Sequence, residues 1–174
     1  RLVTATNDLP SEINTIGLND LLRPLFLFAS VNSAGGTSPI AENRAVFIVL
    51  SAYLTDLDLA TLIGDDVELA LPRVLNVVID SREDLARHVV TSAAIAASAG
   101  AGMAEVLSVY KEVHDSRYRT GFSFTDIAAN QAGTRLGDLA SRSETSAFLF
   151  QDLMKTILNE SEFMPPLGTY DGMT

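Results

Sequence analysis

The chain has 174 residues, no cysteine and a formal net charge of −10 at pH 7, and 47% of its residues are hydrophobic. This length and hydrophobic content predict one folded domain over residues 1–174 and exclude a disordered chain. The absence of cysteine excludes disulfides, thiolate nucleophiles and cysteine-ligated metal sites, and the acidic charge argues against a nucleic-acid partner.

The N-terminal third of the chain has helical patterns. A weak helix is expected over residues 11–30, interrupted near Pro24. A stronger apolar helix is expected over residues 41–55, because Pro39 after Ser38 is typical of a helix start. A short helical turn should follow it. None of these apolar runs is long enough to predict a membrane span.

Residues 73–80 are the best candidate for a β-strand, because they form a short run rich in β-branched side chains. One strand alone is marginal, so this segment needs a partner. The alternatives are the N-terminal residues 2–6 and a second chain.

Further helices are expected in the rest of the chain. Ser81 should cap the first of them, and Thr125 or Ser123 should cap the third. Four helices are expected, at residues 82–100, 101–114, 126–140 and 143–158. An extended tail should follow at residues 163–174. The sequence therefore predicts a mainly α fold: a single-domain orthogonal helical bundle with at most a minor short β-strand pair.

Polar residues in the otherwise apolar, small-residue segment 81–141 are the candidate site. Asp84 and His88 are four residues apart and share one helix face, beside an apolar stripe, so His88 should point toward the core or its rim. Such a pair can orient the imidazole or supply two metal ligands. A core-edge histidine satisfied by a nearby carboxylate is the simpler interpretation.

The next predicted helix contributes Glu112 and Asp115. Both belong to an acidic stripe whose spacing of three and four residues is typical of a solvated face. Periodicity alone therefore favours surface positions for these two carboxylates, and an inward-facing site is the alternative.

The third helix of this segment carries Asp126, Asn130, Gly133 and Gly137 on one stripe. Glycine inside a helix costs about 1 kcal/mol relative to alanine. Two glycines on one face therefore indicate close approach of another helix, with the small faces Ala93/Ala97 or Ala96/Gly100 as the expected partners. This packing would draw Asp126 and Asn130 inward, although Asp126 in a first turn can also serve the helix dipole alone.

These residues also carry a family resemblance. The segments "DLARH", "YKEVHDSR" and "GFSFTDIAANQAGTRLG" resemble a pattern of the YfiM-type bacterial lipoprotein family, and more loosely the VanZ-like membrane proteins. The matched positions, in about residues 80–140, are Asp84, His88, Glu112, Asp115, Asp126, Asn130 and Gly133. The resemblance implies inward-facing acids and a periplasmic or outer-membrane-associated location. Because the chain begins at Arg1, a preceding signal peptide or lipid anchor stays open.

Three functional interpretations remain. In the first, the candidate residues form a hydrogen-bonded network in a structural or interaction domain, with an envelope protein or membrane surface as partner. In the second, His88, Glu112, Asp115 and Asp126 bind one divalent metal ion, Asp84 and Asn130 support them, and Glu112 and His88 act in a hydrolase, with Glu112 as the base. The third is a lipid or small-molecule site along residues 45–55 and 147–158.

Overall fold

The computed structural model describes residues 1–56, 70–99, 124–156 and 159–164. The elements in chain order are α1 (Leu2–Asn7), β1 (Thr15–Gly17), α2 (Leu18–Ala34), α3 (Pro39–Leu54), β2 (Asn76–Val78), α5 (Glu83–Ala99), α7 (Phe124–Ser141), α8 (Glu144–Thr156) and the 3-10 helix η1 (Glu160–Glu162). This confirms the prediction of a helical bundle with one minor strand pair. The helix expected over residues 101–114 lies outside the described residues.

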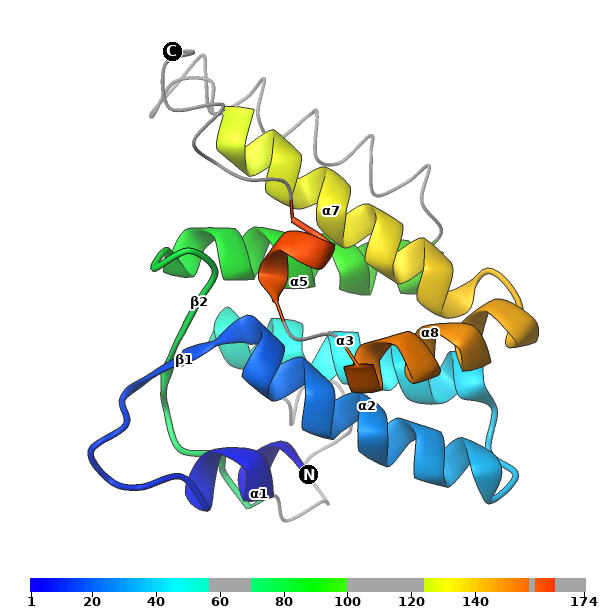
Figure 1. The fold of residues 1–174 in the computed structure, drawn as a ribbon, viewed down its shortest axis with the longest axis horizontal. Helices are drawn as coiled ribbons and strands as arrows, with labels where there is room; N and C mark the ends of the chain where they lie inside the picture. Colours follow the sequence, from blue (N-terminus) through cyan, green and yellow to red (C-terminus); the bar gives the residue numbers. More distant parts are fainter. Residues whose placement is uncertain (57–69, 100–123, 157–158, 165–174) are drawn as a thin grey trace.

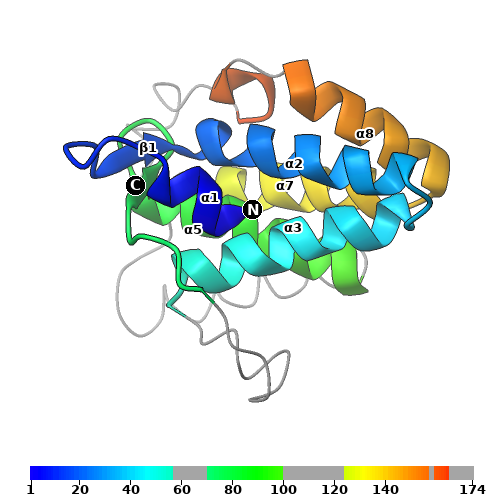
Figure 2. The same cartoon turned by 90° about the horizontal axis from the view of Figure 1, so that it is seen from below.

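The helices pack around one hydrophobic core that extends from Leu2 to Met164. α5 lies along α7, α3 contacts both of these helices, and α2 packs against α3 and α8 (Figures 1 and 2). Phe26, Phe47 and Phe150 meet at the centre, with the ring of Phe26 edge-on to both others at centroid distances of 5.3 and 5.1 Å. Among the described residues, no helix combines the length and the hydrophobicity needed to cross a bilayer.

The first long helix differs from its prediction. α2 begins at Leu18, because the preceding Thr15–Gly17 is extended as β1, and it continues through Pro24 without interruption. Proline removes one backbone donor from a helix. The buried Leu22 and Leu25 on either side of it anchor this part of α2 in the core, which offsets that loss.

The partner of the predicted strand also differs from both alternatives. β2 pairs in parallel with β1, in the register Thr15 opposite Asn76 to Gly17 opposite Val78. Residues 2–6 are helical in α1 instead. Arg73 explains the pairing, since its guanidinium binds the backbone carbonyls of residues 9, 10 and 13 and thereby holds the chain before β1 next to the chain before β2.

α3 connects the other long helices through polar side chains. Its start agrees with prediction, since the Ser38 hydroxyl accepts a hydrogen bond from Ala41 N–H (3.4 Å). In its second turn, Asn43 Nδ2 donates to the carbonyl of Ala140 (2.9 Å) and Arg44 Nε donates to the carbonyl of Ala97 (2.9 Å). Both carbonyls belong to the last described turn of a helix, where carbonyl groups commonly lack an intrahelical donor. α3 therefore satisfies the C-terminal ends of α7 and α5.

The short helix η1 closes the described chain with a carboxylate at the strand pair. Glu160 Oε2 accepts a hydrogen bond from Asp80 N–H (3.3 Å). Burial raises the pKa of Glu160, and the Asp20 and Asp80 carboxylates raise it further, against the lowering effect of backbone hydrogen bonds from Asp80 and Leu18. The folded protein therefore binds this proton more tightly than the unfolded chain does.

Glu160→Gln should consequently change how stability depends on pH. A raised folded pKa means that ionised Glu160 opposes folding at neutral pH, and that this penalty disappears as pH falls through the raised pKa. We expect the glutamine variant to be more stable than the wild type at pH 7 by a few tenths of a kcal/mol, since solvent screens this partly exposed group. The difference should vanish near pH 4 in urea titrations. Glu12→Gln, at an exposed position, is the control and should show no such trend.

Candidate functional site

The site depends on the close contact between α5 and α7. A Cβ atom built on Gly133 would lie 2.1 Å from the carbonyl oxygen of Val89, and one built on Gly137 would lie 2.3 Å from that of Ala93. Separations this short leave room only for glycine. The predicted glycine-mediated approach is confirmed, since a Cβ atom on Gly137 would also lie 2.8 Å from Ala96 Cβ and 3.0 Å from the backbone nitrogen of Ala97.

His88 lies at this contact, and its side chain is 12% exposed. Its Nδ1 is 3.0 Å from Asn130 Oδ1, an oxygen that can only accept, so this contact is a hydrogen bond when Nδ1 carries a proton. The same oxygen accepts a hydrogen bond from the Ser92 hydroxyl (3.0 Å). His88 Nε2 faces Asp126 Oδ2 at 3.3 Å. Each ring nitrogen therefore faces an oxygen of α7.

Asn130 is the most enclosed member of this group, at 4% exposure. Its Nδ2 is buried and has no hydrogen-bond acceptor in the part of the chain that the structure describes. Its backbone carbonyl accepts a hydrogen bond from the Thr134 hydroxyl (2.9 Å). Together with the two bonds to Oδ1, this places the asparagine at the centre of the polar cluster.

Asp84 takes a different partner from the expected one. Both of its oxygens accept hydrogen bonds from Arg82, at 3.2 Å from Nε and 2.5 Å from Nη2. The hydrogen bonds from Arg82 lower the pKa of Asp84, against an opposing effect of burial. The residue that orients His88 across the helix pair is Asn130 rather than Asp84.

Arg82 is a member of the site that sequence patterns did not identify. Besides Asp84, its guanidinium contacts Asp126 Oδ1 (3.7 Å) and donates to the Thr125 hydroxyl (3.2 Å). Arg82 therefore connects the start of α5 with the first turn of α7 and brings a positive charge to the carboxylate that His88 faces.

A tight turn positions Arg82. Residues 79 and 82 exchange two backbone hydrogen bonds, and the intervening Asp80 and Ser81 both have positive φ, at 49° and 64°. Ser81 is therefore part of the turn and does not cap α5, which begins at Glu83. Thr125 likewise is not a cap, because it lies inside the first turn of α7, which begins at Phe124. The predicted Ser81 cap was wrong, and of the two alternatives for α7 Thr125 is not the cap, while Ser123 lies outside the described residues.

The predicted site residues are thus only partly located. His88, Asp126 and Asn130 converge, and Asp84 joins them through Arg82. Glu112 and Asp115 lie outside the described residues, as does Ser123. Within residues 1–56, 70–99, 124–156 and 159–164, no three histidine or acidic side chains are grouped as a metal site requires.

Comparison with known proteins identifies no relative of the chain. No family model, no curated protein and no solved structure matches it.

Proposed function

We propose that the chain is a structural or interaction domain of the bacterial envelope, in which the polar cluster around His88 fixes the pairing of α5 with α7. The observation that carries the structural role is that both ring nitrogens of His88 face oxygens of α7, at 3.0 Å from Asn130 and 3.3 Å from Asp126. Hydrogen bonds between buried side chains of two helices favour the arrangement in which these side chains meet, because each separated partner would lose its bond. The envelope location is supported by the family resemblance of residues 80–140.

A divalent-metal-dependent hydrolase acting on an envelope substrate is the second candidate. In a neutral His88 that carries its proton on Nδ1, the lone pair of Nε2 would face Asp126 Oδ2, 3.3 Å away, and a cation between the two atoms would be bound by both. A second-shell partner on one ring nitrogen and a carboxylate beside the other are typical of a histidine ligand. Glu112 and Asp115 would complete the ligand set, and a bound ion would activate water for Glu112 to deprotonate. Against it, Arg82 already places a positive charge near Asp126.

One set of unfolding measurements tests the proposal. His88→Ala, Asn130→Ala and the double variant are compared with the wild type in urea, with EDTA and with added ZnCl₂. The structural role predicts that each single change lowers the free energy of unfolding by about 1–3 kcal/mol. It also predicts a coupling energy of at least about 0.5 kcal/mol between the two residues, unchanged by EDTA or zinc. Asp84→Asn, at a half-exposed carboxylate, is the control and should cost less than about 1 kcal/mol.

Two results would contradict the structural proposal. Additive effects of His88→Ala and Asn130→Ala would show that their contact does not hold the helices together. A stability that falls with EDTA, rises with zinc and loses both responses in His88→Ala would favour the metal-dependent candidate.

A further inference from the structure

The outward face of α8 carries large apolar side chains. Phe148, Leu149 and Leu153 are 46%, 65% and 46% exposed, whereas Phe150 and Met154 on the other face are buried in the core. A surface helix normally presents polar residues to solvent. Apolar side chains on both faces therefore indicate that the outer face of α8 is used for contact.

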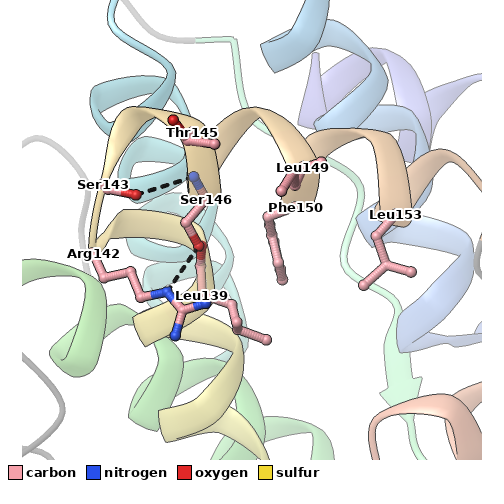
Figure 3. Close-up of a pocket in the computed structure, with 8 residues that line it drawn as sticks. All are labelled: Leu139, Arg142, Ser143, Thr145, Ser146, Leu149, Phe150 and Leu153. Carbon is pink, nitrogen blue, oxygen red and sulfur yellow. Dashed lines mark hydrogen bonds between the residues drawn. The ribbon is translucent and has the colours of Figure 1, made fainter.

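A preformed groove of about 280 Å³ runs beside this face, where α7 turns into α8. Figure 3 shows Leu139, Leu149, Phe150 and Leu153 around it. One end is held by hydrogen bonds, since the Ser146 hydroxyl donates to the carbonyl of Leu139 (2.6 Å) and accepts from Arg142 Nε (3.1 Å). The groove therefore has a fixed wall against which an apolar partner can pack.

We propose that this surface, the outer face of α8 with its groove, docks a basic amphipathic helix of a partner protein. The inference rests on the interaction role proposed above and names its partner class. Leu149 and Leu153 are one helical turn apart, and both line the groove, as helix-in-groove recognition requires.

Charge decides which helix fits. Among the described charged residues at this surface, each cation lies beside an aspartate, since Arg142 is 3.8 Å from Asp138 and Lys155 is 2.9 Å from Asp152, so the two pairs add no net positive charge. Glu144 adds an exposed negative charge at the start of α8. The chain as a whole carries −10, which attracts a basic partner and repels a second copy of itself.

The test uses two synthetic 18-residue helical peptides with the same leucine stripe, one with lysines and one with glutamates on the polar face. Binding is followed by fluorescence anisotropy. We expect the lysine peptide to bind, and the double change Leu149→Ser with Leu153→Ser to weaken it at least tenfold. The matched control is Leu27→Ser with Val31→Ser, in a second apolar groove of about 450 Å³ between α1 and α2, and should leave binding unchanged.

Several outcomes would overturn the inference. They are equal binding of the glutamate peptide, equal weakening by both double variants, or no binding at all. Binding to neutral phosphatidylcholine vesicles that is lost in the α8 variant would instead assign the face to lipid. Melting curves of both double variants exclude unfolding as a cause. If no peptide binds while His88 and Asn130 remain coupled, the docking inference fails and the structural role stands.

Discussion

Gly133→Ala is expected to lower the free energy of unfolding by about 3 kcal/mol. The added methyl group would lie 2.1 Å from the Val89 carbonyl oxygen and 3.0 Å from Ser92 Cβ. The nearest atom is backbone, so that α5 and α7 have to separate before the side chain fits, and overpacking of this kind typically costs 1–3 kcal/mol and sometimes more. Urea unfolding monitored by circular dichroism measures the loss.

Whether Gly133→Ala lowers or raises the free energy of unfolding shows whether helix packing or helix propensity dominates at this position. Alanine favours a helix by about 1 kcal/mol over glycine, so that an uncrowded glycine would give a more stable variant. Gly35→Ala is the comparison, because Gly35 has an ordinary φ of −79° at the end of α2 and its nearest atom, the Asn32 carbonyl oxygen, lies at 3.2 Å. This position is far less crowded than Gly133, so its loss of stability should be much smaller. A Gly133→Ala protein as stable as the wild type would contradict the close contact of α5 with α7.

The same substitution should also disturb the candidate site. Asn130 lies one turn before Gly133 on the same face of α7, and it reaches His88 across the helix pair at 3.0 Å. Separation of the helices would lengthen this hydrogen bond first. In the variant, the coupling between His88 and Asn130 should therefore decrease toward zero, which links the glycine contact to the proposed structural role.

The helix contact was predictable because glycine inside a helix is unfavourable unless something packs against it. Gly133 and Gly137 on one stripe therefore indicated both the contact and its polar end at Asn130. Arg82 was not predictable in the same way. Its position depends on a turn in which Asp80 and Ser81 both adopt positive φ, a conformation that is uncommon for any residue other than glycine and that no glycine marks in this turn.

The partner of β2 and the hydrogen-bond partners of the buried amide side chains could not be predicted from hydrophobic periodicity, for a different reason. β1 is three residues long, too short for an alternating pattern, and the hydrogen bonds of Arg73 to the chain before β1 help to hold it next to β2. A hydrophobic pattern shows that a helix face is buried, but it does not show which carbonyl a buried amide will meet. Asn43 meets that of Ala140, which is 97 residues away along the chain.

Asn43→Asp should destabilise the protein about as strongly as the glycine change, by about 3–5 kcal/mol at pH 7. Asn43 is fully buried, and its Nδ2 donates to the carbonyls of Ala140 (2.9 Å) and Ala147 (3.1 Å). An ionised carboxylate of the same shape would face both carbonyl oxygens without a proton to donate, and burying such a charge is costly. The Gln151 Nε2 donor to Asn43 Oδ1 (2.8 Å) would offset only part of this.

The pH dependence of this variant identifies the cause. Burial beside two carbonyls raises the pKa of the new carboxyl group above its value in the unfolded chain, so that the lost stability should return in part as pH falls through that raised pKa. The protonated group regains one of the two donors, which is why recovery should be incomplete. Gln131→Glu, the same change of amide to acid at an exposed position of α7, should cost less than about 0.5 kcal/mol at either pH. A loss in Asn43→Asp that stays constant from pH 7 to about pH 5 would show that shape, and not the missing donors, makes the asparagine necessary.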